Sequence, residues 1–283
     1  MKIRKPYVAN AFYAGTKAEL TDQITDCFTH RLGPGAVPKP TKDGARKILG
    51  FVAPHAGYMY SGPVAAHDYA QLAADGAPDA VVILGPNHTG AGSGVSILTQ
   101  GSWETPLGVA SIDSTLAEKI RKSSNILDED ETAHLTEHSI EVQLPFTQLL
   151  YGDKIKFVPI CMMMQDLQTS REIAQAIAEQ MTDKHIVVIA SSDFTHYEPH
   201  EVATRNDKTA ITAITALDSS KLNELGETNR VTMCGYGPIT TLMEVAKLKG
   251  NVQPKLLSYQ TSGDITNDKS AVVGYAAILF SRE

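Results

Sequence analysis

Short, almost entirely apolar runs that alternate with helical patterns constrain this chain more than any other feature. Runs of aliphatic and β-branched residues are typical of buried strands, and the segments between them carry apolar residues at helical spacing. The expected strands cover residues 47–53, 80–84, 95–98, 107–112, 156–160, 185–191, 253–259 and 271–280. The expected helices cover residues 17–31, 61–74, 114–122, 139–151, 170–181, 201–216 and 238–247. This alternation predicts an α/β/α sandwich with a largely parallel or mixed central sheet.

A Pro- and Gly-rich segment at residues 33–40 separates the first expected helix from the main body. About 30 residues cannot bury a core of their own. We therefore expect a single domain over residues 1–283, in which residues 1–46 form an N-terminal extension whose short helix packs on the main body. Within that body, we expect the strands at 95–98 and 107–112 to pair with each other.

Composition and charge exclude several classes of protein. A hydrophobic fraction of 42% rules out a disordered chain. The longest mainly apolar run, residues 271–280, is about half of a membrane span, and the N-terminus has no apolar signal segment. A net charge of −7 argues against nucleic acid as a partner. The three cysteines are far apart, which fits a reducing cytoplasm better than a disulfide framework.

Three of the expected strands are each followed by a histidine. His55, His88 and His196 lie after the strands expected to end at residues 53, 84 and 191, and Asp193 lies beside the third. Ligands of open α/β sheets bind beyond the carboxyl ends of the strands. One loop histidine alone is more often structural, but three at equivalent strand ends favour a shared pocket. Neutral imidazole is both the commonest metal ligand and the usual general base near neutral pH.

Two further segments add candidates. His138 and Glu141 are three residues apart where a helix is expected to begin, so they share a face. They could face an acidic substrate or orient a ligand, and plain helix capping by the glutamate is an equally good explanation. Cys234 lies in a Gly-flanked turn before a helix, where a thiol becomes a better metal ligand or nucleophile. The alternative for Cys234 is a small buried hydrophobic residue.

The motifs that carry these residues together resemble the Memo family, also called AmmeMemoRadiSam system protein B in microbes. They are APHAGY at residues 53–58, GPNH at 85–88, EHSIE at 137–141, SSDFTH at 191–196 and CG at 234–235. The resemblance runs over nearly the whole chain. It implies a fold like that of the class III extradiol (LigB-type) dioxygenases, in which two His and one Glu hold a non-haem iron and another His acts as acid/base.

The resemblance also implies roles for individual residues. The expected metal ligands are His55, His88 and Cys234, and the expected catalytic residues are Asp193 and His196, with His196 as acid/base. Four residues are expected around the substrate or behind the ligands, namely His138, Glu141, Tyr58 and Asn87. Cys234 stands where the dioxygenases have Glu, and the softer thiolate shifts metal preference toward copper(I), zinc or a thiolate-tuned iron. Iron or copper is the favoured metal, and zinc is compatible.

We therefore expect a cytoplasmic, redox-active metal-binding protein with a dioxygenase-like pocket. Two alternatives stay open. One is a metal-free hydrolase or transferase with Cys234 as nucleophile, His196 as base and Asp193 as its orienting group. The other is a non-catalytic module that captures a peptide or small ligand near His138. The resemblance implies AMMECR-type and radical SAM proteins as partners, and we expect neither nucleic acid nor a membrane.

Overall fold

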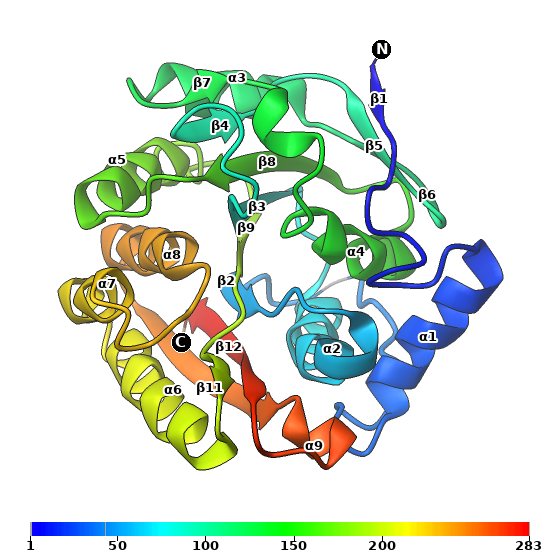
Figure 1. Ribbon diagram of the computed structural model, residues 1–283. Helices are drawn as coiled ribbons and strands as arrows, with labels where there is room; N and C mark the ends of the chain where they lie inside the picture. Colours follow the sequence, from blue (N-terminus) through cyan, green and yellow to red (C-terminus); the bar gives the residue numbers. More distant parts are fainter. Residues whose placement is uncertain (1, 43, 283) are drawn as a thin grey trace.

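The computed structural model describes residues 2–42 and 44–282, and a nine-stranded mixed sheet dominates the described part of the chain (Figure 1). Its strands are β2 (Ile48–Ala53), β3 (Ala80–Pro86), β4 (Val95–Ile97), β7 (Asp128–Glu129), β8 (Lys156–Met162), β9 (Ile186–Ser191), β10 (His196–Glu198), β11 (Val252–Thr261) and β12 (Val272–Arg282). The order across the sheet is β10-β12-β2-β9-β3-β8-β4-β7, and β11 pairs with β12. The sequence-based expectation of an α/β fold with a mixed sheet is confirmed.

The centre of this sheet is parallel. β2 pairs with β9, β9 with β3, and β3 with β8, all in parallel register. Every residue of β2, β3 and β9 is buried, as the uninterrupted apolar runs require of strands covered on both faces. β12 and β4 border this parallel group as antiparallel neighbours of β2 and β8. The carboxyl ends of β2, β3 and β9 therefore meet at one edge of the sheet.

Helices cover both faces of the sheet. They are α1 (Lys17–Thr29), α2 (Tyr58–Asp75), α3 (Ser114–Lys122), α4 (Leu144–Tyr151), α5 (Leu167–Ala178), α6 (His200–Thr215), α7 (Ser219–Glu227), α8 (Tyr236–Lys249) and α9 (Gly263–Thr266), with 3-10 turns η1 (Thr132–His134) and η2 (Glu141–Gln143). Figure 1 shows α5, α6, α7 and α8 on one side of the sheet and α1, α2 and α4 on the other. Among the described residues, no helix combines the length and apolarity that a bilayer crossing requires.

A small second sheet corrects one expectation. The strands expected at 95–98 and 107–112 do not pair with each other. β6 (Gly108–Ser111) pairs with β5 (Ser102–Thr105), which pairs with β1 (Ile3–Arg4), whereas β4 joins β8 and β7 in the main sheet. The reason is Trp103 in β5, which packs against Phe157 and lies under the Arg4 guanidinium. Burial of this large ring stabilises the short, mostly polar strand in the small sheet.

Glu141 ties the N-terminal segment to the main body. Its carboxylate accepts hydrogen bonds from the backbone N–H groups of Tyr7 and Val8 and from the Tyr13 hydroxyl. It also forms a buried ion pair with Arg4, with 2.6 Å between Nη1 and Oε2. These contacts satisfy a charge that would otherwise be costly to bury. They bring the segment that carries Phe12 alongside the sheet edge where the three parallel strands end.

Candidate metal centre

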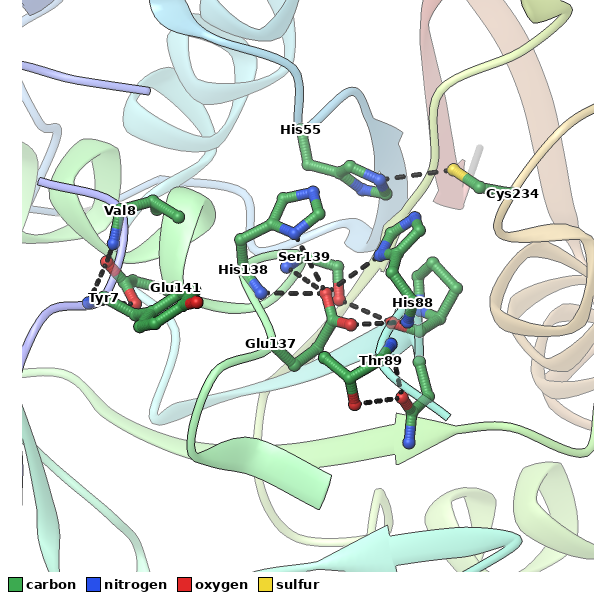
Figure 2. A network of polar contacts seen from close by, with 12 residues as sticks. Tyr7, Val8, His55, His88, Thr89, Glu137, His138, Ser139, Glu141 and Cys234 are labelled. Atoms are coloured by element: carbon green, nitrogen blue, oxygen red, sulfur yellow. Dashed lines mark hydrogen bonds and ion pairs between the residues drawn. The ribbon is translucent and has the colours of Figure 1, made fainter. Parts of the chain in front are cut away.

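Three histidines converge where β2 and β3 end. His55 follows β2, His88 follows β3, and His138 lies in the loop before η2 (Figure 2). Each offers a ring nitrogen, and these three atoms lie within 4.8 Å of one another. The ring centroids of His88 and His138 are 4.6 Å apart, and the His55 ring stands edge-on to both. Three imidazoles at this separation could hold one metal ion, and they match the nitrogen donors of known transition-metal sites.

One buried carboxylate, Glu137, orients two of the three rings. Its Oε1 atom lies 2.9 Å from Nδ1 of His88 and 3.3 Å from Nδ1 of His138. The same carboxylate accepts the backbone N–H groups of His88, His138 and Ser139 at 2.5 to 2.8 Å. A carboxylate only accepts hydrogen bonds, so its bond to His88 favours the tautomer of that ring with the proton on Nδ1. Nε2 then carries the lone pair that a metal needs.

A hydroxyl group fixes the third ring in the same way. The Ser191 hydroxyl, at the end of β9, donates to the carbonyl oxygen of Ser139 at 2.6 Å. Its single proton is thereby used, so it accepts from Nδ1 of His55 at 2.9 Å and from the Gln143 side-chain amide at 2.8 Å. Nδ1 of His55 is therefore the protonated nitrogen, and Nε2 is free to act as a ligand.

Cys234 lies against the free nitrogen of His55. Its Sγ atom is 3.2 Å from His55 Nε2 and accepts the backbone N–H of Asp193 at 3.3 Å. Burial and the nearby Asp193 carboxylate raise the pKa of the Cys234 thiol well above its usual range. Contrary to the expectation for a Gly-flanked turn at a helix start, the surroundings favour the neutral thiol, which can donate to His55 Nε2.

The protonation states of the other groups suit cation binding. Burial lowers the pKa of His55 well below its usual value, and burial likewise lowers the pKa of His138 to about 4, although Glu137 opposes this. Burial raises the pKa of Glu137, but the hydrogen bond and charge of His88 outweigh it and bring that pKa to about 2. At neutral pH the site thus combines neutral His55 and His138 rings with an anionic Glu137 carboxylate behind them. This donor set fits a divalent or monovalent transition metal.

Two glycines allow the loops to approach one another. A Cβ atom on Gly85, near the end of β3, would lie 2.4 Å from the Ser139 hydroxyl. A Cβ atom on Gly235 would lie 2.4 Å from the carbonyl oxygen of Ser191. Any larger residue would push apart the loops that carry His88, His138 and Cys234. The two glycines therefore position the site through close packing.

The predicted catalytic residues lie beside the histidine group. The Asp193 Oδ1 atom accepts the backbone N–H groups of His55 and Ala56 at 2.8 and 3.3 Å. Nδ1 of His196 is 2.8 Å from the carbonyl oxygen of Thr232, an acceptor only, so Nδ1 carries the proton and Nε2 is the basic atom of the neutral ring. Both residues line a cavity of about 680 Å³ that also includes His55, His88 and His138.

Comparison with known proteins decides the family. The model of the family described as Memo-like protein matches residues 4–279. The chain belongs to the Memo family. It is 52% identical over 281 residues to a MEMO1 family protein of Methanopyrus kandleri, with 99% of each chain covered. A MEMO1 family protein of Methanothermobacter thermautotrophicus is 49% identical over 276 residues, covering 97% of this chain and 99% of the relative.

A solved structure supports the architecture of this Memo-family chain. The crystal structure of an uncharacterized protein from Escherichia coli K12 matches it with a TM-score of 0.56 and 13% identity. The match covers 82% of this chain and 99% of the bacterial one. At this identity the likeness concerns the fold alone.

Three residues expected near the substrate or behind the ligands take other places in this Memo-family protein. The Glu141 carboxylate binds the N-terminal segment. The Tyr58 hydroxyl donates to the carbonyl oxygen of Val142 at 2.6 Å within the core. The Asn87 side chain donates to Ala91 and accepts from Thr89 and Gly90, which shapes its own loop. None of the three lines the described part of the cavity.

The Memo-family structure shows contacts that the sequence patterns do not predict. His138 is expected near the substrate or behind the ligands, whereas its ring is the third member of the histidine group. Glu137, Ser191 and Gln143 have no expected role. Only their positions in the sequence point to these residues. Glu137 directly precedes His138, and Ser191 ends a strand that is expected to lead into the site.

Proposed function

We propose that this protein binds a redox-active transition metal, iron or copper, through His55, His88 and His138. The observation that carries the proposal is that hydrogen bonds hold the His88 and His55 rings at Nδ1, through Glu137 and Ser191, and turn Nε2 of each ring toward the group. The Glu137 carboxylate also lies 3.3 Å from Nδ1 of His138. Rings oriented in this way lose less rotational freedom when they bind a metal. The proposal extends to an oxidoreductase reaction on a small molecule in the 680 Å³ cavity.

Cys234 is proposed as a fourth donor because its sulfur lies 3.2 Å from the ligand nitrogen of His55. A thiolate would favour copper(I), zinc or a thiolate-tuned iron over a hard-ligand iron. A bound metal of this kind supplies Lewis acidity and, for iron or copper, one-electron redox chemistry. The three described cysteines are all free, which agrees with a proposed location in the cytoplasm.

His196 is proposed as the acid/base group. Its Nδ1–H is engaged by the carbonyl oxygen of Thr232, and its Nε2 atom can take a proton from a molecule in the cavity. Asp193 positions the loop that follows β2 through the backbone of His55 and Ala56. The carboxylate thereby keeps the His55 ring near the other two.

The alternative with Cys234 as a nucleophile has less support. Burial raises the pKa of the thiol, whereas a cysteine nucleophile needs a lowered one. A binding role without catalysis uses the same cavity and stays a prediction. AMMECR-type and radical SAM proteins stay proposed partners.

Metal analysis of untagged protein tests the proposal. Wild-type protein is expected to bind one iron or copper ion per chain, and His55→Ala, His88→Ala and His138→Ala are each expected to lose most of it. His67→Ala is the matched control, because that ring binds the carbonyl oxygen of Leu32 and does not line the cavity. Electron paramagnetic resonance before and after reduction reports redox activity. Full metal occupancy in a triple-alanine variant would overturn the proposal.

A further inference from the structure

The outer part of the cavity is lined by aromatic and apolar side chains that no metal site requires. Phe12, Tyr60 and Tyr275 form part of its wall, and Met59 and Tyr197 are 63% and 78% exposed at its lining. The backbone of Tyr197 has a φ of 59°, in the left-handed region that is uncommon for a bulky residue. Large apolar side chains left open to water around a cavity are typical of a surface that contacts a ligand.

Two carboxylates line the cavity without a permanently charged basic side chain beside them. Among the described residues no Lys or Arg lines the cavity, and its basic side chains are histidines. The carboxylates are those of Asp193 and Asp268, and the histidines are His55, His88, His138 and His196. The Ser270 hydroxyl and backbone N–H donate to Asp268 and lower its pKa, so this carboxylate is ionised at neutral pH. At the other end, the Glu137 carboxylate offsets part of the charge that a metal would bring. Such a lining attracts cations and disfavours anions.

Two deeply buried polar groups of the cavity keep unused hydrogen-bonding capacity. Asp193 is 5% exposed, and its Oδ1 atom is engaged by backbone N–H groups, but its Oδ2 atom has no hydrogen bond with the described residues. Tyr275 is 2% exposed, and its hydroxyl likewise has no partner in the described chain. Both residues line the cavity, so these two atoms are placed to form hydrogen bonds with a bound molecule.

We propose that the cavity binds a small organic monocation, namely a protonated amine on an apolar or aromatic body. An ammonium group offers three N–H donors to the carboxylates and is attracted to the faces of aromatic rings. The apolar body would pack against Phe12, Met59 and Tyr60. The inference rests on the proposed function in naming the ligand class of the same cavity, but the residues that select the charge are not the histidines.

Three probes of similar shape and different charge test this selectivity in metal-free protein at pH 7. They are 2-phenylethylamine as a cation, 2-phenylethanol as the neutral analogue and phenylacetate as the anion. Calorimetry or protein NMR titration is expected to show the amine binding about three- to tenfold more tightly than the alcohol, from one ion pair and one cation–π contact. Phenylacetate is expected to bind more weakly than the alcohol.

A variant series assigns the effect. Asp268→Asn retains the acceptor for Ser270 and is expected to cut the amine-to-alcohol affinity ratio by about threefold, without changing alcohol binding. Asp166→Asn, a helix-capping residue outside the cavity, is the control and should leave the ratio unchanged. Phenylacetate binding as tightly as the amine, or no binding of any probe at millimolar concentration, would overturn the inference. Because no metal is present, either result leaves the metal proposal to its own test.

Discussion

Replacing Glu137 with Gln is the most direct test of how the proposed metal centre is organised. The carboxylate lies near Nδ1 of two of the three proposed ligand rings, at 2.9 Å for His88 and 3.3 Å for His138. Gln keeps the shape and one acceptor oxygen, but it removes the negative charge and turns the other acceptor into a donor. The new amide group would face the backbone N–H of His88, which Oε2 of Glu137 accepts at 2.5 Å.

The expected magnitude follows from these contacts. Groups that support a metal-ligating histidine typically contribute about 10- to 100-fold to metal affinity. Because Glu137 supports two ligands, we expect Glu137→Gln to weaken metal binding by about 100-fold, at the upper end of that range. That factor corresponds to about 2.7 kcal/mol of binding free energy. Competition against a chromophoric chelator, with cobalt(II) or zinc(II) as the titrant, measures the dissociation constant directly.

Glu141→Gln is the matched control for this experiment. The two glutamates are both buried and lie four residues apart, but Glu141 binds Arg4 and the N-terminal backbone instead of the histidines. We expect this control to lower the free energy of unfolding by about 3–5 kcal/mol, because Arg4 loses its buried partner. Metal affinity of the folded control should stay near the wild-type value. Equal metal affinity in wild type and Glu137→Gln, both folded by circular dichroism, would refute the reasoning.

Three further predictions concern the same centre. Burial lowers the pKa of His138 to about 4, so as the pH is lowered from 6.5 to 5 the unfolded chain binds a proton that the native ring does not. The free energy of unfolding, measured by denaturation curves, should therefore decrease as the pH decreases, and His138→Gln should reduce this dependence. Ser191→Ala removes the acceptor for Nδ1 of His55 and should weaken metal binding about tenfold; an unchanged dissociation constant would contradict the assigned tautomer. Cys234→Ser should reduce the affinity for copper(I) far more than that for cobalt(II), because a hydroxyl is a harder donor than a thiolate; equal losses for the two metals in chelator competition would argue against a role for sulfur.

The central sheet was predictable because its strands have a clear apolar pattern in the sequence. β2, β3 and β9 are continuous apolar runs, since they are buried on both faces. The sequence does not predict β5 (Ser102–Thr105), because this strand is mostly polar and owes its burial to Trp103. α7 (Ser219–Glu227) was also missed, although Asp218 caps it by accepting the backbone N–H of Lys221. Short polar elements depend on tertiary contacts that a local pattern does not contain.

The candidate site was predictable only in part. His55, His88 and His196 could be grouped because each follows a strand of one sheet, and strand ends of parallel neighbours meet. The role of Glu137 depends on a contact with His88, 49 residues away in the chain. No spacing rule covers that separation. The direction of the His138 ring likewise depends on Glu137, so its place among the three histidines could not be predicted from its position near a helix start.

The ion pair between Arg4 and Glu141 has a consequence for biosynthesis. These residues are 137 positions apart, so β1 cannot dock through this ion pair until Glu141 has been synthesised. The loop that then receives it also carries Glu137 and His138, and Cys234 follows later still. The proposed metal centre therefore cannot be completed before Cys234 has been synthesised. Nascent chains that end before Cys234 should not retain copper(I), whereas released chains that contain Cys234 should.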